Sequence, residues 1–348
     1  MQPLPPGDPV AALRRIAFLL ERRQAETFKV KAFRRAAAAL LGLDADELRR
    51  RADAGSLREI EGIGKATEAV VVETLAGQTS TYLADLETGA GPLAPGGAEV
   101  RAALRGDLHT HSDWSDGGSP IEEMVMTAVE LGHEYVALTD HSPRLKVANG
   151  LSAARLTRQL DVLEAVNGHL SAQGERTRVL RGIEVDILDD GGLDQTEELL
   201  GRLDVVVASV HSKLRMERGP MTRRMLGAVR NPRTNVLGHC TGRLVTGGRG
   251  TRPQSEFDAE AVFTACRDHD VAVEINSRPE RQDPPDDLLA LAVEIGCVFS
   301  VDSDAHAPGQ LDFLDHGAAR VAALGVPLER VVTTWPLDEL LAWAAKRA

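Results

Sequence analysis

Histidines and carboxylates recur in closely spaced pairs after residue 105. His109 and His111 are two residues apart, and Asp304 and His306 repeat that spacing. Side chains two residues apart on an extended chain project to the same side, so each pair can hold one metal ion between its members. A carboxylate such as Glu184 can in addition bridge two ions. Zinc and manganese accept such mixtures of nitrogen and oxygen donors, so the pattern predicts a metal site.

These pairs fall where apolar, strand-like runs of the sequence end. A single histidine after a strand is more often structural, but six of the ten histidines fall at predicted strand ends or just beyond them. The other four lie in predicted helices or at their ends, and we expect them to be packing or surface residues. The predicted metal cluster consists of His109, His111, Asp116, His141, Glu184, His211, His239, Asp304 and His306.

Strand-like runs alternate with amphipathic helices throughout the part of the chain that carries these residues. The predicted strands are 105–109, 134–139, 179–187, 204–211, 235–239, 271–276 and 296–302. The predicted helices include 119–131, 152–172, 220–230, 255–268 and 284–295. Such alternation favours a parallel α/β barrel, whose active site forms at the carboxyl ends of its strands. Seven strands are clearer than eight, so we expect a distorted, seven-stranded (β/α) TIM-like barrel.

The first 87 residues show helical periodicity only. Apolar residues recur at helical spacing between Val10 and Leu20, after an Asp8-Pro9 start signal, and further helices are predicted over 29–41 and from residues 44 and 65. Residues 88–98 are rich in Gly and Pro and have no periodicity. The predicted organisation is a small all-α domain over 1–87, a linker over 88–100 and the barrel domain over 101–348.

The composition is that of a globular chain, with 43% hydrophobic and 26% charged residues. No apolar run approaches the roughly 20 residues of a bilayer span, so no membrane partner is expected. The three scattered cysteines indicate a reducing compartment, and the opening Met1–Gly7 shows no leader pattern, so we expect a cytoplasmic location. The net charge of −12 arises after residue 87, because 1–87 hold 13 basic and 13 acidic residues. An acidic barrel is an unusual nucleic-acid binder by itself, but bound dications would offset its charge.

Five stretches of the barrel resemble the PHP (polymerase and histidinol phosphatase) family. They are Asp107-Leu108-His109-Thr110-His111-Ser112, Thr139-Asp140-His141, Gly182-Ile183-Glu184-Val185-Asp186, Ser209-Val210-His211-Ser212 and Ser303-Asp304-Ala305-His306. The resemblance implies a phosphoesterase that uses about three divalent ions, which would be zinc, manganese or iron. It would place His109, His111, Glu184 and Asp304 on a first ion, Glu184, His211 and His239 on a second, and Asp116, His141 and His306 on a third.

Within that family, the chain most resembles the PHP domain of bacterial X-family DNA polymerases. Leu237–Leu244 and Glu274-Ile275-Asn276 are similar to motifs of that subgroup, although Cys240 stands where proline is expected. The first domain resembles the small lyase-type domain of these polymerases through Phe28–Ala37 and the helix-hairpin-helix-like Ile60–Ala66.

This second resemblance implies that the first domain docks on DNA. Two glycines would permit the tight turn of the hairpin, and backbone N–H groups at the next helix start can hold a phosphate, although an ordinary helix end and turn would look the same. Val70 stands where the family has its Schiff-base lysine, so we expect no lyase activity there, and 88–104 has no room for a polymerase palm and fingers. The implied DNA-binding residues are Lys29, Lys31, Arg34, Arg35, Gly62, Gly64 and Lys65.

We therefore expect hydrolysis of phosphodiester bonds in single-stranded or gapped DNA, by a 3′-5′ exonuclease or repair nuclease that could work as a monomer. Lys213 and Arg243 follow ligand strands and would hold phosphate oxygens or else be surface charges. The alternatives are a histidinol-phosphatase-type enzyme for small phosphomonoesters, a metal-dependent amidohydrolase, and a DNA-binding protein with a relic barrel. The hairpin, the Asp304-Ala305-His306 motif and the complete ligand set argue against them in turn. The expected catalytic residues are His109, His111, Glu184, His211, Asp304, Lys213 and Arg243.

Overall fold

The computed structural model describes residues 5, 7–248 and 250–345, which form two compact units. The first unit comprises Met1–Pro92 with Pro308–Gln310, and the second comprises Leu93–Ala307 with Leu311–Ala348. Most of the opening Met1–Gly7, on which the expectation of no leader rests, lies outside the described residues. None of the helices in the described ranges combines the length and the hydropathy that crossing a bilayer requires.

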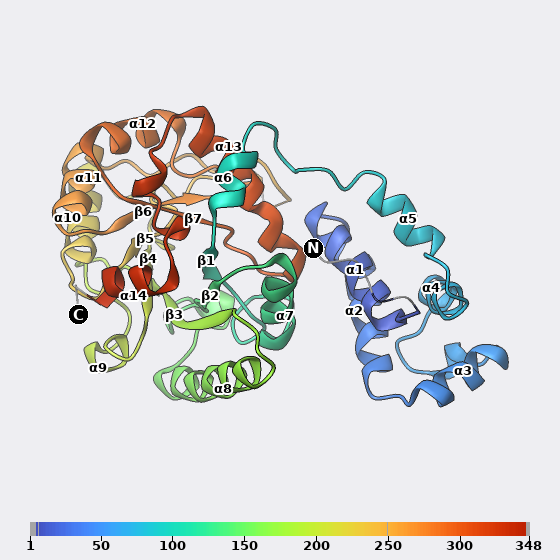
Figure 1. Cartoon of the computed structure of the whole chain (residues 1–348). Helices are drawn as coiled ribbons and strands as arrows, with labels where there is room; N and C mark the ends of the chain where they lie inside the picture. The colour runs from blue at the N-terminus through green and yellow to red at the C-terminus, as the bar shows by residue number, and fades with distance from the viewer. Residues whose placement is uncertain (1–4, 6, 249, 346–348) are drawn as a thin grey trace. The chain divides into compact units, whose positions relative to one another are not determined.

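Seven parallel strands form the centre of the second unit (Figure 1). Each pairs with the next in chain order, and a bridge between Thr110 and Ala305 joins the first strand to the segment after the last. The backbone N–H of His111 donates to the carbonyl of Ala305 at 2.8 Å across this junction. The predicted α/β fold with seven strands is thus confirmed. The strands are β1 Gly106–Thr110, β2 Tyr135–Leu138, β3 Arg178–Asp186, β4 Val205–Ser209, β5 Val236–Leu237, β6 Ala272–Asn276 and β7 Phe299–Asp302.

Helices connect the strands and cover them with apolar side chains. The first turn of α8 is capped by the hydroxyl of Ser152, and α7 and α12 end at glycines with positive φ, Gly132 and Gly296, as local sequence signals require. The core between helices and strands includes Met225 of α10 and Phe263 of α11. The helices of this unit are α6 Ala98–Ala103, α7 Ile121–Leu131, α8 Ala153–Ala172, α9 Glu197–Leu200, α10 Arg218–Val229, α11 Ala259–Asp268, α12 Asp286–Ile295, α13 Leu314–Ala323 and α14 Leu337–Ala345, with short 3-10 turns at η2 Lys146–Ala148, η4 Leu328–Arg330 and η5 Val332–Thr334. A further 3-10 turn, η3 Pro308–Phe313, begins in the stretch that belongs to the first unit.

Among its described residues the first unit has helices and connecting turns and no strand. Asp8 caps α1 by accepting the backbone N–H of Ala11 at 3.0 Å, and α1 packs its apolar residues against α2. The interval 88–100 that was predicted as a linker contains the start of α6, and Leu93 already donates its backbone N–H to Asp315 of the second unit at 2.8 Å. The helices are α1 Pro9–Arg22, α2 Thr27–Leu41, α3 Ala45–Asp53, α4 Lys65–Leu75 and α5 Thr81–Glu87, with a 3-10 turn at η1 Leu57–Glu59.

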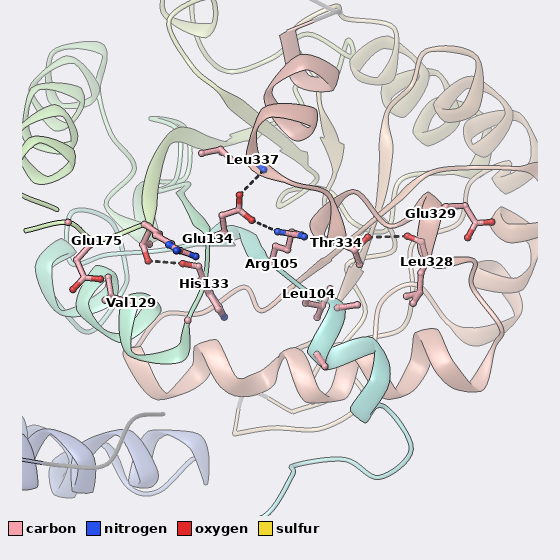
Figure 2. A pocket seen from close by; sticks show the side chains of 16 residues that line it. Leu104, Arg105, Val129, His133, Glu134, Glu175, Leu328, Glu329, Thr334 and Leu337 are labelled. Carbon is pink, nitrogen blue, oxygen red and sulfur yellow. Dashed lines mark hydrogen bonds and ion pairs between the residues drawn. The ribbon is translucent and has the colours of Figure 1, made fainter. Parts of the chain in front are cut away.

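A groove of about 1160 Å³ lies at the amino ends of β1, β2 and β3 (Figure 2). Arg105 and Glu134 form an ion pair of 2.8 Å within its lining, beside the buried His133. The groove lining includes none of the nine predicted metal ligands. Chemistry in a parallel barrel is found at the other end, where the strands finish.

Candidate metal centre

The nine predicted ligands all lie at or just beyond the carboxyl ends of the strands. The structure brings them into four overlapping groups, and within each group the possible ligand atoms lie within 4.8 Å of one another. Eight of them are buried or half-buried, and Asp116 is exposed. The groups are His109, His111 and Asp304; His109, Glu184 and His239; His141, Glu184 and His211; and His111, Asp116, His141 and His306.

The carboxylate of Glu184, at the end of β3, is central to the cluster. Its Oε2 lies 3.3 Å from Nε2 of His109 and 2.8 Å from Nδ1 of His141. Its Oε1 lies 3.1 Å from Nε2 of His211 and 2.8 Å from Nε2 of His239. One oxygen thus faces each side of the cluster, which is the arrangement that a carboxylate bridging two ions needs.

Four of the distances between neighbouring donor atoms fit ligation of a shared metal ion, whereas the 2.8 Å contacts of Glu184 with His141 and His239 are as short as hydrogen bonds. Two atoms bound to one tetrahedral ion at about 2.0–2.2 Å lie roughly 3.3 Å apart, which is longer than an ordinary hydrogen bond. The four separations that fit are 3.3 Å for His109 and Glu184, 3.5 Å for His111 and Asp304, and 3.4 Å for Asp116 with each of His141 and His306.

Several of these donor atoms are buried without a hydrogen-bond partner among the described residues. They are Nε2 of His109 and His211, both ring nitrogens of His111, Nδ1 of His141 and His239, and Oε2 of Glu184. Leaving a buried polar atom unpaired is costly unless another group satisfies it. The donor set and the unpaired atoms therefore fit a multinuclear metal site.

The imidazoles of the cluster differ in their pKa shifts. Burial lowers the pKa of an imidazole, but neighbouring carboxylates outweigh it at His109, His211 and His141 and raise their pKa, to about 10 for His141, so a bound ion would have to displace protons there. Burial, followed by the charges of His306 and His141, lowers the pKa of His111 to about 3, so this ring is neutral. Burial opposes ionisation of Glu184, but the surrounding imidazoles, His211 first, outweigh it and hold its pKa well below the usual range. Neutral imidazoles and ionised carboxylates are the forms that ligate metals.

Two carboxylates outside the predicted set hold the imidazoles in place. Oε1 of Glu274, in β6, lies 2.5 Å from Nδ1 of His109, and Oδ1 of Asp186, at the end of β3, lies 2.7 Å from Nδ1 of His211. Such contacts fix which ring nitrogen faces the ion and raise its basicity. In the sequence, Glu274 is recognised only as part of a family motif, with no role of its own. A carboxylate within an apolar strand could have indicated a functional residue there.

The other aspartates beside the ligands do not contact imidazoles. Asp140 accepts hydrogen bonds from Ser112, Ser115 and Gln159, and so holds the loop after β1. Asp107 instead accepts the backbone N–H groups of His109 and Ser303. Their role is to fix the backbone from which the ligands project.

Asp304 is held in an uncommon conformation by its neighbours. Its φ of 51° lies in the left-handed region, which non-glycine residues rarely adopt. Arg281 donates to its Oδ2 at 3.0 Å, and Asn276 donates to the same oxygen at 3.2 Å. Arg278 donates to the Asp304 carbonyl and lies 2.9 Å from Nδ1 of His306. The sequence reasoning identified neither arginine.

The cluster opens into a cleft of about 340 Å³. The guanidinium groups in its lining belong to Arg252 and Arg281, whereas Lys213 and Arg243 are not part of the lining. The Lys213 ammonium pairs with Asp189 at 2.5 Å, and Arg243 donates to the carbonyl groups of Arg281 and Gln282. The two predicted phosphate-binding residues therefore have other partners and do not line the cleft.

The predicted DNA-binding hairpin has the expected geometry at its turn. Gly62 has φ +95°, and a Cβ there would lie 3.4 Å from the carbonyl of Arg35, so glycine allows both the turn and the close approach to α2. Gly64 donates its N–H to the Thr67 hydroxyl at 2.9 Å, and Glu68 donates its N–H to the Gly64 carbonyl at 2.9 Å. The N–H groups of residues 65–67 precede the first intrahelical bond, where a helix start can hold an anion.

The basic residues of α2 divide into exposed and paired groups. Lys31 and Arg35 are exposed, as is Lys65 at the start of α4. Lys29 is exposed but pairs with Glu26 at 2.8 Å. Arg34 differs from the prediction, because its side chain is only 11% exposed and binds the buried Glu21 through Nε at 3.0 Å and Nη2 at 2.7 Å. Arg34 therefore stabilises the helical unit rather than offering a cation to DNA.

Two domain families match this chain. The PHP domain matches residues 107–278, and the helix-hairpin-helix domain matches residues 6–80. The DNA polymerase/3′-5′ exonuclease PolX of Bacillus subtilis is 38% identical over 214 residues, which are 62% of this chain and 36% of that protein. This chain thus spans little more than a third of that relative.

Two further proteins are similar to part of this chain. A probable phosphatase of Caldicellulosiruptor bescii is 30% identical over 213 residues, which are 58% of this chain and 80% of that protein. The solved structure of histidinol phosphate phosphatase from Lactococcus lactis, complexed with zinc, L-histidinol and phosphate, has 18% identity and a TM-score of 0.46 over 64% of this chain and 95% of that one. With its buried cluster of histidines and carboxylates at the strand ends, the chain belongs to the PHP family of metal-dependent phosphoesterases.

Proposed function

We propose that this chain hydrolyses phosphodiester bonds of DNA and removes nucleotides from a 3′ end. The observation that supports this most is the complete metal cluster in a chain that also carries a helix-hairpin-helix domain. The similarity to the polymerase/3′-5′ exonuclease of Bacillus subtilis points to the same polymer and polarity.

The proposed metals are about three divalent ions, zinc, manganese or iron, held by the nine clustered residues. When bound, such ions lower the pKa of a water molecule and stabilise charge on phosphate oxygens. Two of the imidazoles are already oriented for metal binding, because Glu274 and Asp186 contact Nδ1 of His109 and His211. Arg281 lines the cleft and would bring a fixed positive charge to the phosphate.

In the proposed DNA complex, the first unit would hold the polymer rather than cut it. The N–H groups that begin α4 would bind a backbone phosphate, with Lys31, Arg35 and Lys65 adding exposed positive charge. These contacts carry no base information, so docking would not depend on sequence. Single-stranded and gapped DNA are the proposed substrates.

A direct test uses the full chain with manganese and a 5′-labelled oligonucleotide, single-stranded or within a gapped duplex. The expected result is a ladder that shortens from the 3′ end and is absent with His211→Ala, which removes one predicted ligand. Intact DNA at full metal occupancy would overturn the proposal. An Arg218→Ala variant, at the exposed start of α10, is the matched control and should retain wild-type cleavage.

A second candidate is a phosphatase for small phosphomonoesters. It is favoured by the similarity to the probable phosphatase of Caldicellulosiruptor bescii, 80% of whose length is matched. The cleft of about 340 Å³ is large enough for such a substrate. Rapid release of phosphate from histidinol phosphate, with DNA left intact, would favour this candidate over the nuclease.

A further inference from the structure

One side chain in the lining of the metal cleft is apolar and almost fully exposed. Val147 is 95% exposed, although it lines the same cleft as His141 and His211. Leu214 and Leu244 continue the apolar lining. Single exposed apolar residues are common on protein surfaces. Val147 differs from most of them because the loop that carries it is restrained.

The loop that carries Val147 is tied to a predicted ligand at both ends. The chain leaves β2 through His141, and Leu151 donates its backbone N–H back to the His141 carbonyl at 2.7 Å. Between them, Gly150 passes so close to Ser142 that a Cβ would lie 1.8 Å from its carbonyl oxygen. Ala148 is buried beside the exposed Val147 and anchors the η2 turn.

Arg155, in the first turn of α8, restrains the same loop by hydrogen bonds to backbone carbonyl groups. Its Nη1 donates to the Asn149 carbonyl at 2.7 Å and lies 3.4 Å from the Gly150 carbonyl, and its Nη2 donates to the Trp114 carbonyl. Asn149 itself donates to Trp114 at 3.2 Å. A loop restrained in this way keeps Val147 in place without a packing partner, as a contact surface for a ligand requires.

The charged residues around Val147 indicate which kind of ligand would contact it. Arg252 and Arg281 line the cleft, and Lys146, beside Val147, is exposed. A ligand that satisfies both features carries an anionic phosphate joined to a group with an apolar face. A nucleotide has this chemistry, whereas inorganic phosphate and small hydrophilic esters have only the first part.

We infer that Val147 contacts the nucleoside next to the scissile phosphate and so makes the cleft selective for nucleotides over simple phosphate esters. This inference rests on the function proposed above and names the part of the substrate that the cleft recognises. The valine acts in binding and does not take part in the chemical step.

The test compares two ligands that differ only by the nucleoside. The Kd of thymidine 5′-monophosphate and of inorganic phosphate would be measured by calorimetry on the manganese-loaded full chain. The wild type should bind the nucleotide more tightly. Val147→Ala should reduce this preference about 3- to 10-fold, because two methyl groups are lost from the contact. Val147→Asp should reduce it further, because a hydrated carboxylate would replace the apolar contact with the nucleoside. Phosphate affinity should change less than twofold in Val147→Ala.

The controls separate this inference from the proposed function. Met126→Ala removes another exposed apolar side chain, on α7 outside the cleft lining, and should keep the wild-type preference. Since Val147 is nearly fully exposed, its variants should melt at the wild-type temperature. If the wild type degrades DNA but both Val147 variants keep its preference, the inference fails and the proposed function stands. If the wild type neither degrades DNA nor prefers the nucleotide, both fail.

Discussion

The carboxylate of Glu274 lies 2.5 Å from Nδ1 of His109, with both side chains fully buried. Its other oxygen accepts the backbone N–H of His239, so one residue of β6 fixes two predicted ligands. Glu274→Gln should weaken metal binding about 10- to 100-fold, because the amide cannot hold the His109 ring as a carboxylate does. Chelator competition measures this Kd. An unchanged Kd in a folded variant would show that His109 needs no such support.

Glu184 belongs to two of the four donor groups, whereas Asp116 belongs to one. Glu184→Gln should therefore lose more than one ion per chain, and Asp116→Asn should lose one and keep the others. Metal content after desalting, measured by plasma mass spectrometry, distinguishes these results. Equal losses in the two variants would contradict the bridging position of Glu184.

Arg34 and Arg35 are neighbours on α2 with different surroundings. Arg34→Ala leaves Glu21 buried without its cation and should destabilise the helical unit by about 3 kcal/mol. Arg35→Ala should leave stability unchanged and weaken DNA binding, with a smaller salt dependence. All three tryptophans, Trp114, Trp335 and Trp343, lie in the barrel unit.

That distribution of tryptophans provides the control for Arg34→Ala. Urea unfolding followed by circular dichroism should shift to lower urea, while the fluorescence transition of the barrel should stay at its wild-type midpoint. A shift of both signals, or of neither, would contradict a stabilising role confined to the helical unit.

His133, beside the groove at the amino ends of the strands (Figure 2), should make stability depend on pH. Burial, followed by the charge of Arg101, lowers its pKa to about 3, and neither ring nitrogen has a hydrogen-bond partner among the described residues. The unfolded chain takes up a proton near pH 6.5 and the folded chain does not, so stability is present above that pH and is lost as the pH falls toward 3. The loss from this group should reach about 3 kcal/mol by pH 4.

His133→Gln removes the titrating group and should reduce the difference in unfolding free energy between pH 7 and pH 4 by that amount. Urea unfolding at the two pH values measures the difference. His169→Gln, at an exposed position of α8, is the matched control and should keep the wild-type difference. A His133→Gln variant with the full wild-type difference would show that the group does not control acid stability.

The sequence was most informative where a regular strand determines side-chain direction. Strand ends lie together in a parallel barrel, so residues such as His109 and Glu184 could be placed in one cluster from periodicity alone. The structure brings the whole predicted set together. Its overlapping groups place His239 with His109 and His211 with His141. Oε1 of Glu184 lies close to both His211 and His239, so the assignment of residues to individual ions stays a prediction.

Prediction was weaker where loops or distant partners decide. Lys213 follows a ligand strand, but it adopts φ 52° and pairs with Asp189 from another loop. Arg34 was predicted to bind DNA with the other cations of α2, because its partner Glu21 belongs to a different helix and could not be recognised from the sequence. Contacts between segments far apart in the chain leave no periodic signal in the sequence. The partners of Lys213 and Arg34 can therefore be identified only from the three-dimensional structure.

The backbone N–H of Leu151 donates to the carbonyl of His141, so one hydrogen bond closes the loop between these two residues. Changes of the exposed side chain at its tip can therefore be absorbed locally, without moving β2 or the imidazole that follows it, whereas Ala148 and Gly150 are held by close contacts. Val147, at the tip, is free to vary while the residues that perform hydrolysis stay fixed. Related barrels could acquire new substrates through changes at the tip of this loop. Substrate specificity could then evolve separately from the hydrolytic reaction.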